Sequence, residues 1–164
     1  MNSMVDQIFT FLIILIFVTA FGLMYKSWLD KKQSGKETRK KKQEILINIL
    51  KKKAEYYQSK FVANDIEEIK LMLAKDYSLL VRGIPYRIDG IDEAVKWLQK
   101  AMEESPGQSI IDQRITLIND DAGIITFNWL RGGASGKTTH VWRHQFDDGW
   151  HLVHEHTSYN PNEK

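Results

Sequence analysis

The feature that most constrains the fold is the alternating sequence on either side of Asp147-Asp148-Gly149, from Thr138 to Ser158. A glycine-containing turn between two runs of alternating polar and apolar residues is a strong signal for a β-hairpin. A three-residue loop gives three cross-strand pairs: Phe146 with Trp150, Trp142 with His154, and His140 with His156. In the alternative register, Asp148-Gly149 forms a two-residue turn and Arg143 lies opposite His154.

All five histidines of the chain lie in this predicted hairpin. Successive side chains of a strand point to opposite faces, so the three-residue loop places His140, Trp142, His154 and His156 on one face. We therefore predict that this face lines a ligand pocket. Three imidazoles are also suitable ligands for Zn²⁺, but no Asp, Glu or Cys shares the face within the hairpin, and we expect no metal and no cofactor.

A stretch without charged residues, from Gln7 to Tyr25, lies near the N-terminus. As a helix rising about 1.5 Å per residue it reaches about 28 Å, enough to cross the hydrocarbon core of a bilayer. A cleaved secretory signal is disfavoured, because Asp6 precedes the stretch and Met24-Tyr25-Lys26 is a poor cleavage site. Basic residues follow the stretch and none precedes it. The positive-inside rule thus predicts a single-pass protein of the cell membrane with a cytoplasmic C-terminal domain.

These features divide the chain into an anchor at 1–26, a basic juxtamembrane linker at 27–43 and a folded domain at 44–164. The linker cluster Arg39-Lys40-Lys41-Lys42 is expected to attract anionic lipid headgroups, at about 1 kcal/mol per basic residue near the surface, or only to fix the topology. Ser34-Gly35 predicts a break in the helix. Nucleic-acid binding is not expected, because no aromatic residues are interleaved with this cluster. The absence of cysteine excludes disulfides and thiolate chemistry.

The folded domain shows three helical patterns followed by strand patterns. We predict helices from Glu44 through Phe61, from Asp65 to about Asp76, and at 91–104. One face of the first helix carries an apolar stripe of Ile45, Ile49, Leu50, Ala54, Tyr57 and Phe61, and Asn64-Asp65 offers an N-cap for the second. We also predict an extended segment at 78–88 and strands at 110–118, 123–130 and in the final hairpin. Helices segregated from antiparallel strands indicate an α+β fold, with a curved antiparallel sheet packed on the helices. If the even-numbered residues of 123–130 face the cavity, Ile125, Phe127 and Trp129 form an outer apolar surface, which predicts a dimer.

The segment Gly132 to Thr138 is similar to a phosphate-binding P-loop, because Gly136-Lys137-Thr138 follows other glycines. The spacing is one residue short of the P-loop pattern, with Arg131 at the position of the first glycine. The segment also leads into a strand, so no helix N-terminus is present to hold a phosphate. We therefore predict an ordinary hairpin loop.

The order of three helices and a β meander, ending in the sequence from Asp148 to Pro161, resembles the nuclear transport factor 2-like superfamily. It is most similar to the SnoaL-like branch and to the association domain of calcium/calmodulin-dependent kinase II, over about Glu44 to Pro161. The resemblance implies a cone-shaped α+β barrel that encloses a pocket and is usually dimeric or assembled in a larger ring. The pocket arginines of the association domain correspond here to Asn128 and His140. Neither has the charged bidentate geometry that captures an anion.

Enzymes of this superfamily use a dyad of Asp, His or Tyr in the cavity, and the sequence shows no complete match. Asp76 and Tyr86 are candidates near the cavity mouth. The predicted ligand-binding residues are therefore Tyr86, Asn128, His140, Trp142, His154 and His156.

We expect a binding and assembly domain on a single-pass membrane protein, with a small hydrophobic or polar ligand. The protein would act as a homodimer or as a subunit of a membrane complex. One alternative is a cofactor-independent lyase, isomerase or hydrolase that acts on a small hydrophobic substrate. Another is an accessory subunit of a larger membrane complex. A paired acid and base inside the cavity would favour the enzyme.

Overall fold

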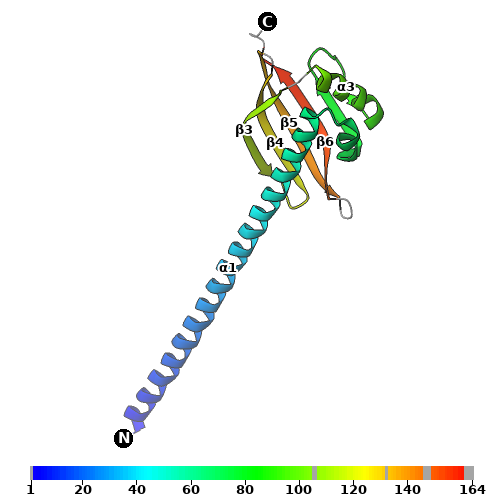
Figure 1. Ribbon diagram of the computed structural model, residues 1–164. Helices are drawn as coiled ribbons and strands as arrows, with labels where there is room; N and C mark the ends of the chain where they lie inside the picture. The colour runs from blue at the N-terminus through cyan, green and yellow to red at the C-terminus, as the bar shows by residue number, and fades with distance from the viewer. Residues whose placement is uncertain (1, 105–106, 132, 146–148, 161–164) are drawn as a thin grey trace. The chain divides into compact units, whose positions relative to one another are not determined.

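The computed structural model describes residues 2–104, 107–131, 133–145 and 149–160, with side chains from residue 17 onward except residue 18 (Figure 1). Contacts between Cα atoms divide the chain into two compact units, Met1–Lys42 and Gln43–Lys164.

Helix α1 (Asn2–Val62) contributes to both units and has 61 residues. It continues through Ser34-Gly35, where the sequence predicts a break, and the Thr38 hydroxyl donates to the Ser34 carbonyl at 2.9 Å. A glycine inside a helix costs only about 1 kcal/mol relative to alanine, and the neighbouring lysine and glutamate residues favour a helix. One glycine is thus insufficient to end it.

No helix is long and apolar enough to cross a membrane within the part of the chain whose side chains the structure describes. Most of the predicted span at 7–25, namely residues 7–16 and 18, lies outside that part. The side chains described next to it are strongly exposed: Phe17, Phe21, Leu23 and Met24 are each 70–74 % accessible. The described side chains of the first unit therefore form an exposed apolar surface on the helix.

In the second unit, α1 buries most of the stripe that its sequence predicts. Leu50, Ala54, Tyr57 and Phe61 recur at helical spacing and are at most 8 % exposed. The first two residues of the predicted stripe, Ile45 and Ile49, are instead 59 % and 45 % exposed. The strands between residues 109 and 159 curve past this part of α1 (Figure 1). The stripe thus forms one wall of the hydrophobic core.

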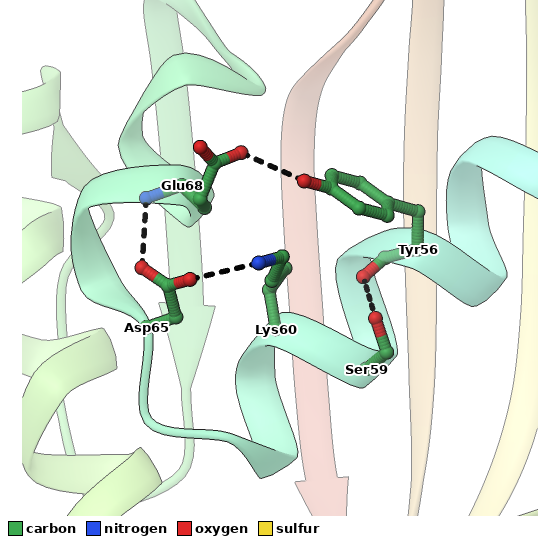
Figure 2. A network of polar contacts seen from close by, with 5 residues as sticks. All are labelled: Tyr56, Ser59, Lys60, Asp65 and Glu68. Atoms are coloured by element: carbon green, nitrogen blue, oxygen red, sulfur yellow. Dashed lines mark hydrogen bonds and ion pairs between the residues drawn. The ribbon is translucent and has the colours of Figure 1, made fainter.

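The turn after α1 is fixed by a polar network around Asp65, which Figure 2 shows. Asp65 caps helix α2 (Ile66–Leu71) by accepting from the Glu68 backbone N–H at 3.4 Å, and it also accepts from the Lys60 ammonium group at 2.9 Å. The Tyr56 hydroxyl donates to the Glu68 carboxylate at 2.9 Å. The predicted capping residue is confirmed, and these contacts connect α2 to the preceding helix.

Helix α2 ends earlier than the sequence predicts, at Leu71 rather than near Asp76. Strand β1 (Leu73–Val81) begins at once and buries Tyr77 and Leu79 on one face with the period of a strand. The Leu152 N–H donates to the Met72 carbonyl at 2.9 Å, which joins the start of β1 to the last strand. Here pairing within the sheet is favoured over continuation of the helix.

Strand β2 (Ile88–Asp89) and helix α3 (Ile91–Glu103) follow, then β3 (Ser109–Leu117), β4 (Ala122–Arg131), β5 (Ala134–Gln145) and β6 (Gly149–Tyr159). The strands form a six-stranded sheet in the order β2-β1-β6-β5-β4-β3. Strand β1 is parallel to β6, and the other pairs are antiparallel. The α+β fold with a curved sheet is confirmed, but the sheet is mixed rather than antiparallel. The long chain between β1 and β6 supplies the crossover that parallel neighbours need.

The final hairpin forms, but its predicted register is wrong. Strand β5 pairs Trp142 with Leu152 and Val141 with His154, which leaves Val153 as an extra residue on β6. This β-bulge shifts the alternation of the strand by one residue. Before the bulge, Trp150 and Leu152 face the core; after it, Glu155 does. Of the predicted loop residues 147–149, residues 147 and 148 lie outside the described residues, whereas Gly149 already pairs with Gln145 in the hairpin.

The predicted outer surface on β4 is also wrong. Ile125, Phe127 and Trp129 are 0–5 % exposed and lie in the core, whereas Asn128 is on the opposite face. Burial of large apolar side chains contributes about 25 cal/mol per Å², so the aromatic face of β4 turns inward. Phe127 is therefore no basis for a dimer interface.

Candidate functional site

A cavity of about 60 Å³ lies between the sheet and the helices of the second unit. Its walls come from α1, β1, α3, β4, β5 and β6 and from Gln108. The lining is largely aromatic and aliphatic, with a smaller polar group. Its polar and charged members are Gln58, Gln108, Arg131, Thr138, His140, Glu155 and Thr157.

The polar part of the lining centres on the buried carboxylate of Glu155, which is 8 % exposed. Its Oε2 atom accepts from the Tyr57 hydroxyl at 3.1 Å and lies 3.3 Å from Nε2 of His140, while the Tyr77 hydroxyl is at 3.5 Å. Its Oε1 atom accepts from the Thr157 hydroxyl at 3.1 Å. A buried carboxylate is tolerated when several donors surround it in this way.

These donors keep Glu155 ionised. Burial by itself raises the pKa of Glu155, but the attraction of His140 and the hydrogen bonds from His140, Tyr57 and Thr157 outweigh it, and the pKa is lowered. Burial, followed by the Glu155 charge, raises the pKa values of Tyr57 and Tyr77 well above the ordinary value. Both tyrosines thus remain protonated and donate to the carboxylate.

His140 is the predicted site residue that the structure places in the cavity. Its ring is 2 % exposed and makes edge-to-face contacts with Tyr57 and Phe127 at centroid distances of 5.2 and 5.0 Å. Its Nδ1 atom is buried and has no hydrogen-bond partner among the described residues, as is true of Nε2 of Gln58. Both residues line the cavity.

The other predicted site residues do not converge on the cavity, and that prediction is wrong. Trp142 is fully buried in the core behind it, edge to face with Tyr57 at 6.0 Å. His154 donates to or accepts from the Ser78 hydroxyl at 2.8 Å on the other face of the sheet, and His156 is exposed. Asn128 lies on that face as well, and Tyr86 is 65 % exposed in the turn after β1. The bulge at Val153 explains why His154 and His156 lie away from the cavity. The inverted faces of β4 explain the same for Asn128.

Asp76, a candidate for the cavity mouth, instead forms a bidentate ion pair with Arg143. The two guanidinium nitrogens of Arg143 lie 2.8 and 3.1 Å from the carboxylate oxygens of Asp76. The Arg143 hydrogen bond lowers the pKa of Asp76. This pair joins β1 to β5 at an exposed position, away from the cavity lining.

Metal-binding clusters of three or more His, Cys, Asp or Glu residues are absent from the described part of the chain. The predicted trio of His140, His154 and His156 is separated by the sheet. The sequence did not predict the residues that surround His140 in the structure, of which Glu155 is the most important. The alternation on β6 assigned Glu155 to the outer surface, and only the bulge brings it inward.

The sequence matches no protein-family model and no curated protein. Solved structures are nevertheless similar in fold. A candidate dehydratase of the nuclear transport factor 2-like family from Streptomyces avermitilis is 19% identical, with a TM-score of 0.59, over 70% of this chain and 95% of that one. A ketosteroid isomerase-like protein from Erwinia carotovora atroseptica is 15% identical, with a TM-score of 0.59, over 69% and 95%.

A proposed calcium/calmodulin-dependent protein kinase II association domain from Xanthomonas campestris is also similar, at 15% identity and a TM-score of 0.56, over 66% of this chain and 83% of that one. The folded domain thus has the α+β fold of nuclear transport factor 2-like proteins, as its sequence predicts. At these identities the likeness shows the fold alone.

Proposed function

We propose that the folded domain binds a small molecule in the cavity around His140 and Glu155. The observation that carries this proposal is a buried imidazole, paired with a hydrogen-bonded carboxylate, whose second nitrogen has no hydrogen-bond partner among the described residues. A buried polar atom without a partner costs about 1–3 kcal/mol, and a bound molecule can supply that partner. The fold supports the proposal, because solved structures with this fold are described as isomerase-like and dehydratase proteins.

A compound that co-purifies with the protein tests this function. We expect mass spectrometry of the denatured full-length chain, purified in detergent, to show a small molecule that is lost from His140→Ala. His154→Ala is the matched control, because His154 is a hairpin histidine outside the cavity lining and should leave the compound bound. Circular dichroism must show that both variants fold. Equal loss from the two variants, or none from either, would contradict the proposal.

A second candidate function is cofactor-independent catalysis as a lyase, isomerase or hydrolase. The pairing of His140 with Glu155 in the cavity favours it, because a carboxylate that positions an imidazole is a recurrent arrangement for a general base. The co-purified compound, or its precursor, should then be converted by the wild-type chain and not by His140→Ala. A compound that is bound unchanged over time would leave binding as the function.

We also propose that the first unit anchors the protein in the cell membrane through a single span at 7–25, with the folded domain in the cytoplasm. Support comes from its exposed apolar side chains and from a stacked pair, Tyr25 and Trp28, with ring centroids 6.0 Å apart. The Lys32 ammonium group lies 4.8 Å from the Trp28 ring centroid. Aromatic rings followed by basic residues are typical of a helix at the membrane interface, where anionic headgroups attract the lysines.

Single cysteines test the topology, since the chain contains none. In intact cells, Lys164→Cys should be protected from a membrane-impermeant thiol reagent and should react after permeabilisation. Ser3→Cys, on the other side of the span, should react in both states. Labelling of Lys164→Cys before permeabilisation would overturn the cytoplasmic assignment.

Assembly, as a homodimer or as a subunit of a larger membrane complex, is part of the same proposal. The fold supports it, because one solved structure with this fold is described as an association domain. Light scattering of the gently solubilised protein should give a mass above that of one chain. A monomer without co-purifying proteins would contradict it.

A further inference from the structure

Two buried nitrogen atoms of the cavity lining constrain the chemistry of a ligand. Nδ1 of His140 and Nε2 of Gln58 have no hydrogen-bond partner among the described residues. The side chains come from different elements, His140 from β5 and Gln58 from α1, and both residues line the cavity. The role of each nitrogen as donor or acceptor follows from its chemistry and its neighbours.

The Glu155 carboxylate determines where the imidazole proton lies. An ionised carboxylate only accepts hydrogen bonds, so Nε2 of His140, 3.3 Å from Oε2, carries a proton. In the neutral form of the ring this is the one N–H group, and the other ring nitrogen, Nδ1, is an acceptor. The Gln58 amide nitrogen can only donate. The cavity thus offers one unpaired acceptor and one unpaired donor.

The neighbouring hydroxyl groups are already committed. Thr157 donates to Glu155, so in the 2.9 Å contact between the Thr138 and Thr157 hydroxyls the proton must come from Thr138. Tyr57 also directs its proton to Glu155. The hydroxyl protons of these three residues are consequently not available to a ligand.

The charges of the lining favour an uncharged ligand. Arg131 and Glu155 carry opposite charges, and the other described lining residues are neutral when His140 is neutral. The Arg131 guanidinium lies 5.8 Å from the centroid of the Trp129 ring. An anion against Nδ1 would meet a lone pair and the nearby Glu155 charge, which disfavours a carboxylate at this position.

Resting on the proposed binding function, we infer that the cavity binds a small uncharged molecule with both an N–H or O–H donor and a carbonyl acceptor, such as a primary carboxamide. The donor would pair with Nδ1 of His140 and the acceptor with the Gln58 amide. The cavity volume of about 60 Å³ suits a molecule of about four to six non-hydrogen atoms, because a single water needs about 10–15 Å³ of a cavity volume measured in this way.

Three probes with the same number of non-hydrogen atoms separate the alternatives. Propionamide has a donor and an acceptor, 2-butanone has only an acceptor, and propionate has acceptors and a negative charge. Each is titrated at neutral pH into the full-length chain in detergent micelles, with ¹⁵N-labelled histidine rings. Single Gln replacements of His144, His151, His154 and His156 assign the His140 signals by elimination.

We expect the ¹⁵N spectrum to show the proton of His140 on Nε2 and propionamide to shift the Nδ1 signal. Propionamide should bind at least about tenfold more tightly than 2-butanone or propionate. Those two probes lack a donor for Nδ1 of His140, and leaving this buried acceptor unpaired weakens binding by at least about tenfold. Gln58→Leu should weaken propionamide and 2-butanone by similar factors, whereas His154→Gln should change neither.

A proton on Nδ1 of His140 would overturn the proposed ligand class. Binding of propionate or 2-butanone as tight as that of propionamide would also overturn it. Neither result would contradict the proposed small-molecule binding function. If none of the probes shifts the His140 signals, the ligand class is also wrong. The binding function is then decided separately by the co-purified compound.

Discussion

Replacing Glu155 with alanine is expected to destabilise the folded domain by about 3 to 5 kcal/mol, because several buried donors lose their acceptor and each buried group left unpaired costs about 1–3 kcal/mol. The change leaves His140 Nε2 and the hydroxyls of Tyr57 and Thr157 without their common acceptor. Urea denaturation of the full-length chain in detergent, followed by circular dichroism, measures the free energy of unfolding.

Glu68→Ala is the matched control for this result. Glu68 also accepts a hydrogen bond from a tyrosine hydroxyl, that of Tyr56 at 2.9 Å, but at an exposed position. Its removal should cost less than about 1 kcal/mol. Similar losses from the two variants would show that the Glu155 network does not stabilise the core.

The same carboxylate makes stability depend on pH. Because the pKa of Glu155 is lower in the folded chain than its ordinary value of 4.5, its contribution is fully present above that value. The contribution is lost as the pH falls through the folded pKa, where protonation removes the acceptor. Glu155→Gln should therefore flatten the acid side of the stability curve, and an unchanged slope would contradict this origin.

The second large effect is expected for Trp150→Ala, which should cost about 3 to 5 kcal/mol. Trp150 is 3 % exposed and packs edge to face with His144 at a centroid distance of 5.5 Å. Its removal leaves a cavity that the surrounding sheet and helix can fill only in part. The same denaturation experiment measures it. Trp28→Ala, where the side chain is 54 % exposed, should change the unfolding free energy by less than about 0.5 kcal/mol.

Local patterns in the sequence predict much of this fold. The cap at Asp65, the amphipathic helix α3 and the buried stripe on α1 each follow from spacing within one segment. The structure confirms them, except that the stripe is buried only from Leu50 onward. The sequence also predicts correctly that the glycine-rich segment is a hairpin loop and not a P-loop, because a strand, β5, begins at Ala134 where a P-loop would lead into a helix. The α+β fold then follows from the order of these segments.

What the sequence does not predict depends on pairing between distant segments. The parallel contact of β1 with β6 joins residues far apart in the chain, and it also ends α2 early. The faces of β4 are fixed by which side the helices cover. The site is predicted in part: His140 is in the cavity, but its partner Glu155 depends on an extra residue at Val153 that no local signal marks.

The bulge at Val153 lets one strand present even-numbered and then odd-numbered residues to the same side of the sheet. If β6 paired regularly through Val153, the positions now held by Glu155, Thr157 and Tyr159 would be taken by His154, His156 and Ser158, since a shift of one residue exchanges the faces of a strand. Deletion of Val153 would instead remove the unpaired residue and keep Glu155 opposite His140. Formation of the bulge thus selects an acidic and hydroxyl lining over an imidazole lining, with the rest of the scaffold unchanged.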